Sequence, residues 1–202
     1  MRSRGDRVLV WDIETMHMPR DGEPIGEYVQ RCGISLAAVW DDLDHEWCLY
    51  GNRDIDALVA KLEEADLVVG YNSVGFDHLV LDAVAGRRTI FEELDLWNVI
   101  QASMGSSRWG PGKGTLDAVS RRTLGRGKSG SGSDAPALAQ EGRWYELANY
   151  CMHDVELTKE LWQFMERHGY VIDPVGGKHR VGKKLKLEGQ DADVESVLRQ
   201  EV

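Results

Sequence analysis

The chain has 202 residues, with 34 acidic and 24 basic side chains and a formal net charge of -10 at pH 7. A chain of this length can bury one ample hydrophobic core, and a hydrophobic content of 42% is ordinary for a soluble globular protein. The negative charge excludes a protein that coats nucleic acid through its overall field, but it leaves local contact with nucleic acid open.

No apolar run approaches the roughly 20 residues needed to span a bilayer, and the first six residues lack the apolar segment of a signal peptide. The three cysteines, Cys32, Cys48 and Cys151, form neither a paired metal-binding motif nor an even disulfide set, which fits a reducing compartment. We therefore expect a cytoplasmic protein with no membrane partner.

The first predicted element is a buried strand over residues 7–13 that acquires two carboxylates where it ends. Because side chains alternate along a strand, Asp12 and Glu14 point to the same side as Val8 and Val10. Ionised groups on such a core-facing side are unfavourable unless a positive charge neutralises them. No Lys or Arg stands nearby in sequence, so a hard divalent cation is the simplest partner. The alternative is that both acids lie in a solvated loop.

The next stretch predicts a mixed sheet. A polar loop over residues 16–26 is followed by strands over 34–40 and 46–50, joined as an antiparallel hairpin. Residues 54–65 have apolar side chains at a helical period, and 67–71 form a short apolar strand. Three strands, a helix and a further strand indicate a mixed sheet with helices packed on it.

Residues 70–77 lead from this strand into a helix that extends to Ala85. Asp77 stands in the first turn, at the edge of the expected buried stripe; an Asp there is also favoured by the helix dipole alone. Asn72 is likewise an ordinary loop residue. The expected buried stripe comprises Phe76, Leu79, Val80, Ala83 and Val84.

A strand over residues 91–95 and a helix over 96–104 follow, and then a glycine-rich loop over 105–114. Thr115 is the expected N-cap of a helix that extends through Leu124.

The loop over residues 125–134 contains Gly127-Lys128-Ser129, which resembles the end of a phosphate-binding loop. That motif is excluded because position 122 is Arg where the motif requires Gly, and because a helix rather than a strand precedes it. We expect a flexible surface loop.

The longest predicted helix covers residues 144–168. Asp154 interrupts its apolar stripe, and Tyr150 lies one turn earlier on the same face. The alternative to a functional role is a core Tyr whose hydroxyl is satisfied by the neighbouring Asp. The remaining members of the stripe are Leu147, Leu157, Leu161 and Met165.

Three segments resemble the motifs of the DEDD superfamily of 3'-5' exonucleases, the DnaQ-like proteins. They are Trp11-Asp12-Ile13-Glu14-Thr15, then Tyr71-Asn72 through Phe76-Asp77, then Tyr150-Cys151-Met152-His153-Asp154. The resemblance covers the chain from about Val8 to Leu161.

Position 149 is Asn where the His type of this superfamily has its His, and His153 points about 100° away from Asp154 around the helix. The match is therefore to the Tyr type, with Tyr150 in that role. The segment from Thr115 to Gly125, together with Lys128, also looks like the link between motifs in this subfamily.

The resemblance implies an RNase H-like α/β fold, with a mixed five-stranded central sheet and helices on both faces. This exonuclease domain would cover residues 1–168, and residues 169–202 would form a small hairpin and an acidic tail. The tail is a possible binding segment for a protein partner.

The resemblance also implies two Mg²⁺ or Mn²⁺ ions about 4 Å apart. Asp12 would bridge them, Glu14 and Asp154 would complete the first site, and Asp77 would hold the second ion. Tyr150, a poor general base with a reference pKa near 10, would orient the attacking water.

The activity implied is removal of nucleotides from the 3' end of mainly single-stranded DNA or RNA, with release of nucleoside 5'-monophosphates. The alternatives are a non-catalytic nucleic-acid- or partner-binding module on the same scaffold, and an endonuclease. The expected substrate contacts are Asn72, Phe76, Thr15 and Lys128, with Trp109, Lys113 and Arg126 as further candidates for guiding the strand.

Overall fold

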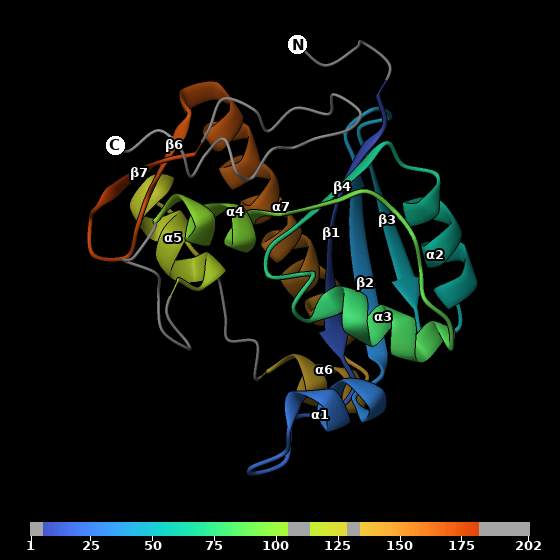
Figure 1. Ribbon diagram of the computed structural model, residues 1–202. Coiled ribbons are helices and arrows are strands. Elements are labelled where there is room, and N and C mark those ends of the chain that lie inside the picture. The colour runs from blue at the N-terminus through green and yellow to red at the C-terminus, as the bar shows by residue number, and fades with distance from the viewer. Residues whose placement is uncertain (1–5, 105–113, 129–133, 182–202) are drawn as a thin grey trace.

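The computed structural model describes residues 6–104, 114–128 and 134–181 (Figure 1). Its centre is a five-stranded sheet in the order β3-β2-β1-β4-β5. The strands β2 and β3 form an antiparallel hairpin beside β1, whereas β4 and β5 run parallel to β1. The strands are β1 (Val8–Thr15), β2 (Ile34–Asp41), β3 (Glu46–Gly51), β4 (Leu67–Gly70) and β5 (Glu93–Asp95).

Helices cover both faces of this sheet, as Figure 1 shows. The alternation of side chains along β1 divides the core in two. Val8 and Val10 pack in one apolar cluster with residues of α4, α5 and α7, while Leu9, Trp11 and Ile13 pack in another with residues of α1, α2 and α3. The predicted mixed sheet with helices on both faces, the RNase H-like α/β arrangement, is confirmed. The helices are α1 (Ile25–Arg31), α2 (Ile55–Glu63), α3 (Asp77–Ala85), α4 (Leu96–Ser103), α5 (Leu116–Thr123), α6 (Ala135–Gln140) and α7 (Trp144–His168).

The long helix α7 has the bounds that the sequence predicts, and Thr115 caps α5 by accepting a hydrogen bond from the N–H of Ala118 at 3.3 Å. The short helices α1 and α6 were not predicted. Helix α1 follows Pro24 and ends just before Gly33, whose φ of +64° favours glycine. Both short helices lie near the carboxyl end of β1 (Figure 1).

The predicted buried stripe of α3 is wrong in part. Leu79 and Val84 are 44% and 38% exposed, and the buried residues of this helix are Asp77, Val80 and Leu81. The helix is therefore rotated relative to the prediction, and its first acid faces the sheet instead of standing at the edge of the apolar face.

The predicted C-terminal hairpin is present as β6 (Tyr170–Ile172) and β7 (Lys178–Arg180), paired antiparallel. Val171 and Val181 are buried in the same apolar cluster as Val8. The acidic tail lies outside the described residues. Within the described ranges, no helix is long and apolar enough to cross a membrane.

Candidate functional site

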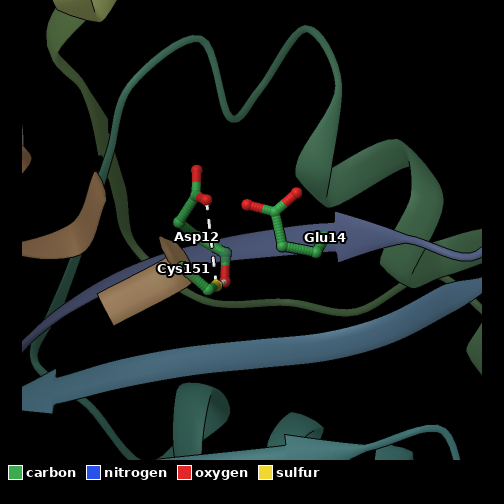
Figure 2. Close-up of side chains that lie close together, drawn as sticks. All are labelled: Asp12, Glu14 and Cys151. Atoms are coloured by element: carbon green, nitrogen blue, oxygen red, sulfur yellow. Dashed lines mark hydrogen bonds between the residues drawn. The ribbon is translucent and has the colours of Figure 1, made fainter. Parts of the chain in front are cut away.

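The side chains of Asp12 and Glu14 project from the same side of β1, as the alternation of a strand predicts (Figure 2). Glu14 is buried, and Asp12 is half-buried. The side chain of Cys151 reaches toward them from α7. One potential ligand atom from each of these three residues lies within 4.8 Å of the other two.

Cys151 was not predicted as a site residue. Its thiol lies 3.5 Å from the carbonyl oxygen of Asp12 and 3.9 Å from that residue's Oδ2, both within reach of an S–H donor. Burial raises the pKa of the Cys151 thiol well above its usual value, and the charge of Asp12 adds to the rise. The thiol therefore stays protonated and acts as a weak donor to Asp12. Its position three residues before Asp154, on the same helical face, is the sequence signal that points to it.

Asp77 joins the site from the first turn of α3. Its Oδ1 accepts a hydrogen bond from the backbone N–H of Ile13 at 3.2 Å, between the two acids of β1. Burial raises the pKa of Asp77 to about 7, although the hydrogen bond from Ile13 opposes the rise. Because β1 and β4 are parallel neighbours, the loop that follows β4 brings Asp77 to the end of β1.

The four predicted acids lie within electrostatic reach of one another. Burial raises the pKa of Asp12 well above its usual value, and the charges of Asp77, Asp154 and Glu14 raise it further. Burial likewise raises the pKa of Glu14 to about 8, with repulsion from Asp154 as the next cause. In the absence of a cation, several of these carboxyls would therefore bind protons near neutral pH.

Asp154 and Tyr150 enter the site from α7, and both are more than nine-tenths buried. Among the described residues, Oδ1 of Asp154 and the hydroxyl of Tyr150 make no hydrogen bond of normal geometry. Burial raises the pKa of Asp154, while Lys128 and, more weakly, the nearby Tyr150 hydroxyl oppose the rise. The Tyr150 hydroxyl and Oδ1 of Asp154 are therefore buried polar atoms with unused hydrogen-bonding capacity. This is unfavourable unless a ligand or a water molecule bonds to them.

In the part of the chain that the structure describes, Lys128 is the basic side chain that pairs with the central acids. Its Nζ lies 2.5 Å from Oδ2 of Asp154 and 5.8 Å from the centre of the Tyr150 ring. The predicted surface position is observed for the exposed Gly125 and Arg126, but it is wrong for Lys128, whose side chain is only 25% exposed. The positive charge that partly neutralises the acids thus comes from Lys128, far from Asp12 in sequence.

The predicted substrate contacts Thr15 and Phe76 are linked through Tyr28. The Thr15 hydroxyl lies 3.1 Å from the Tyr28 hydroxyl, and the Phe76 ring stacks on the Tyr28 ring at a centroid distance of 5.8 Å. The Tyr28 hydroxyl also donates to the carbonyl of His17 at 2.9 Å. Helix α1, absent from the predicted elements, therefore supports both residues beside the acids.

The third predicted contact, Asn72, has a φ of +60°, in the left-handed region that Asn tolerates better than most residues. Its N–H donates to Oδ1 of Asp95 at 2.8 Å, and the N–H of Val74 donates to Oδ2 at 3.2 Å. Asp95 also caps α4 by accepting hydrogen bonds from the N–H groups of Trp97 and Asn98. This buried carboxylate, which was not predicted as a site residue, holds the loop that leads into Asp77. Its position just before a helix is the signal that points to it.

Other candidates lie elsewhere. Trp109 and Lys113 fall outside the described residues. Arg126 pairs with Glu156 and Glu160 on the surface of α7. His153 has its Nε2 3.2 Å from the carbonyl of Gly127, so its ring contacts the loop, and its charge helps to oppose the rise of the Asp154 pKa.

A second group of acidic residues differs from the central acids in its cationic partners. Asp41, Asp44 and Glu46 also gather ligand atoms within 4.8 Å, but Arg7 and Lys61 both form ion pairs with Asp41. Burial alone would raise the pKa of Asp41, yet the hydrogen bond from Lys61 and two backbone donors lower it. Asp41 thus has two cationic partners, whereas among the described residues the four central acids share one ion pair, between Lys128 and Asp154.

The chemistry of the central donors fits a hard cation. Carboxylate oxygens dominate the set, and the thiol is protonated, so these donors suit a hard cation better than a metal that selects thiolate. The unused Oδ1 of Asp154 is a further ligand atom. The acidic residues can therefore hold metal ions.

No protein-family model matches the sequence, and no curated protein matches it. Among solved structures, the chain is similar to the family B DNA polymerase from the hyperthermophilic archaeon Pyrobaculum calidifontis, with 21% identity and a TM-score of 0.60. The match covers 80% of this chain and 24% of the polymerase chain, so this protein corresponds to about a quarter of the polymerase. At this level of identity the likeness shows the fold: the α/β arrangement described above is shared with a part of a DNA polymerase.

Proposed function

We propose that this protein is a metal-dependent 3'-5' exonuclease acting on single-stranded DNA or RNA and releasing nucleoside 5'-monophosphates. The observation that carries the proposal is the convergence of four acids from β1, α3 and α7 on one largely buried place. Their mutual repulsion and burial raise the pKa of Asp12 in particular. Such a gathering is unfavourable in the folded protein unless cations bind there.

The four acids would hold two Mg²⁺ or Mn²⁺ ions. Asp12 would contribute to both sites, with Glu14 and Asp154 at the first and Asp77 at the second. When bound, a pair of such ions stabilises the negative charge that develops on the attacking and leaving oxygens of a phosphodiester.

Tyr150 would orient the attacking water. Burial raises the pKa of its hydroxyl further above its usual value, so the hydroxyl remains protonated at neutral pH and is no base. The hydroxyl is buried and makes no hydrogen bond of normal geometry with the described residues. The hydroxyl lies close enough to Asp154 to oppose the rise of that residue's pKa, and it would hold the water there by a hydrogen bond.

The remaining residues would bind the end of the strand. Phe76 is partly exposed and supported from behind by Tyr28, which suits a ring that stacks on a terminal base. Asn72 and Thr15 would contact the sugar and phosphate of the last nucleotides. Lys128 would meet a phosphate only after its ammonium leaves Asp154.

The alternative from another class is a binding module without turnover. The presence of all four acids and of Tyr150 argues against it, since a module that only binds nucleic acid gains nothing from a costly cluster of buried carboxylates. An endonuclease on the same scaffold would need no free 3' end, so the form of the substrate separates the two activities.

The test uses 5'-labelled single-stranded DNA and RNA side by side, with Mg²⁺ or Mn²⁺ and then with EDTA. The proposal predicts a ladder of products that shorten from the 3' end and no shortening in EDTA. Cleavage that persists in EDTA would contradict the metal dependence, and fragments from a circular single strand would show an endonuclease. Binding of the strand without shortening would favour the binding module.

A further inference from the structure

The ammonium of Lys128 occupies a position that a metal ion would compete for. It lies 2.5 Å from Oδ2 of Asp154, one of the acids assigned to the first ion. Burial lowers the pKa of Lys128, but attraction to Asp154 and Asp12 outweighs burial and leaves the pKa raised. Of the residues that the structure describes, this is the one Lys or Arg side chain that forms an ion pair with any of the four carboxylates.

The loop that carries Lys128 is fixed on α5. The N–H of Lys128 donates to Oδ1 of Asp117 at 2.8 Å, and Arg121 donates to the carbonyl of Lys128 at 3.4 Å. Asp117 and Arg121 are themselves paired at 2.9 Å. The backbone of Lys128 is therefore held on both sides by one turn of helix.

The same loop is fixed on α7, the helix that carries Asp154. Nε2 of His153 lies 3.2 Å from the carbonyl of Gly127, and Arg126 forms ion pairs of 2.8 and 2.9 Å with Glu156 and Glu160. Gly127 fits where a larger residue would not, because a Cβ there would overlap the side chains of Asp117 and Arg121. Contacts on two helices thus aim the Lys128 side chain at the acids.

We propose that Lys128 is the resident counter-ion of the acid cluster and that it competes with divalent cations for Asp154. The competition rests on the proposed function, because it assumes that the four acids bind metal. A divalent ion at Asp154 would repel the ammonium and take over its bond to the carboxylate. The ammonium and the metal ion would weaken each other's binding to Asp154, and such coupling is reciprocal. Removal of the ammonium should therefore strengthen metal binding by the factor that the ammonium had cost it.

The test compares Lys128→Met with Lys159→Met. Lys159 lies on α7, with its ammonium 4.0 Å from the centre of the Trp40 ring, so the control removes one lysine charge at a place away from the acids. Mn²⁺ affinity is measured by isothermal titration calorimetry without substrate, and Tm is measured in EDTA. We expect Lys128→Met to bind Mn²⁺ about tenfold more tightly than wild type and to melt at a lower temperature in EDTA. Lys159→Met should match wild type in Mn²⁺ affinity.

A second variant, Asp117→Ala, keeps the Lys128 ammonium but removes the acceptor that holds the Lys128 backbone. It should also strengthen Mn²⁺ binding, by a smaller factor than Lys128→Met. Unchanged or weaker Mn²⁺ binding by Lys128→Met, with normal binding by wild type, would overturn the competition. An unchanged Tm in EDTA would overturn the role as counter-ion. Absence of Mn²⁺ binding by every protein would defeat the competition and the metal-dependent function together. Normal Mn²⁺ competition without cleavage of any oligonucleotide would defeat the proposed function alone.

Discussion

Oδ1 of Asp77 accepts a hydrogen bond from the backbone N–H of Ile13, and this bond ties the start of α3 to β1 between its two acids. The carboxylate thus has a structural contact and a proposed metal-binding role. The two can be separated because an amide oxygen can replace a carboxylate oxygen as acceptor without carrying its charge.

Asp77→Asn should therefore fold normally and lose activity. We expect its Tm in EDTA to equal or exceed that of wild type, because one like charge is removed from the cluster. The rate of 3' shortening should fall by about 100-fold or more. Asp77→Ala should lose both activity and stability, since the N–H of Ile13 then loses its partner. A fully active, folded Asp77→Asn protein would exclude this acid from the metal site.

The metal-free protein should become less stable as the pH rises. Burial raises the pKa of Glu14 to about 8 and that of Asp77 to about 7, whereas both groups have a pKa near 4 in an unfolded chain. Between about pH 4 and pH 8 the folded state therefore binds more protons, so the free energy of unfolding falls as pH increases. Melting curves in EDTA from pH 5 to pH 8 should show a declining Tm, and the decline should be shallower for Glu14→Gln. Parallel declines in the two proteins would show that Glu14 does not titrate in this window.

Tyr150→Phe should lower activity without lowering stability, unlike a typical core mutation. The hydroxyl makes no normal hydrogen bond with the described residues, so its removal should leave Tm unchanged or slightly raised. Activity should fall by about tenfold and not vanish, because orientation of the water is lost while the acids stay in place. Thermal melts and initial rates of 3' shortening measure the two effects, and a rate equal to that of wild type would remove Tyr150 from the mechanism.

Asp95→Ala tests the support of the loop before Asp77. The buried carboxylate accepts hydrogen bonds from the N–H groups of Asn72 and Val74 and also caps α4. Its loss should cost about 2–4 kcal/mol of stability and lower activity at least about tenfold. The conservative Asp95→Asn keeps one acceptor oxygen and should recover part of both losses. If Asp95→Ala lowers Tm while the rate of shortening at saturating substrate is unchanged, the residue is structural only.

The elements with strong periodicity could be predicted from the sequence. Helix α7 has an apolar stripe at spacings of three and four over 25 residues, and its predicted bounds are confirmed. The alternation along β1 placed Asp12 and Glu14 on one side, as observed (Figure 2). Helices α1 and α6, with seven and six residues, are too short to show a period. The available signals were Pro24 just before α1, Pro136 in the first turn of α6, and the glycines Gly33 and Gly142 that follow the two helices.

The contacts across the fold could not be read from local pattern. The apolar residues of α3 lie around more than one of its faces, so the sequence did not decide which face would pack on the sheet. Leu79 and Val84 were predicted to be buried but are exposed. The approach of Lys128 to Asp154 depends on the packing of a glycine-rich loop between two helices. Such a loop has no period, so its partners follow only from the tertiary structure.

Asp12 lies at the centre of the account, because the charges of Asp77, Asp154 and Glu14 all act on it. The most direct test is the shortening of a 5'-labelled single strand in Mg²⁺ or Mn²⁺ by wild type and by Asp12→Asn, with circular dichroism to confirm that both are folded. We predict stepwise shortening from the 3' end by wild type and none above the protein-free control by Asp12→Asn. A folded Asp12→Asn protein that shortens the strand at the rate of wild type would contradict the proposed site.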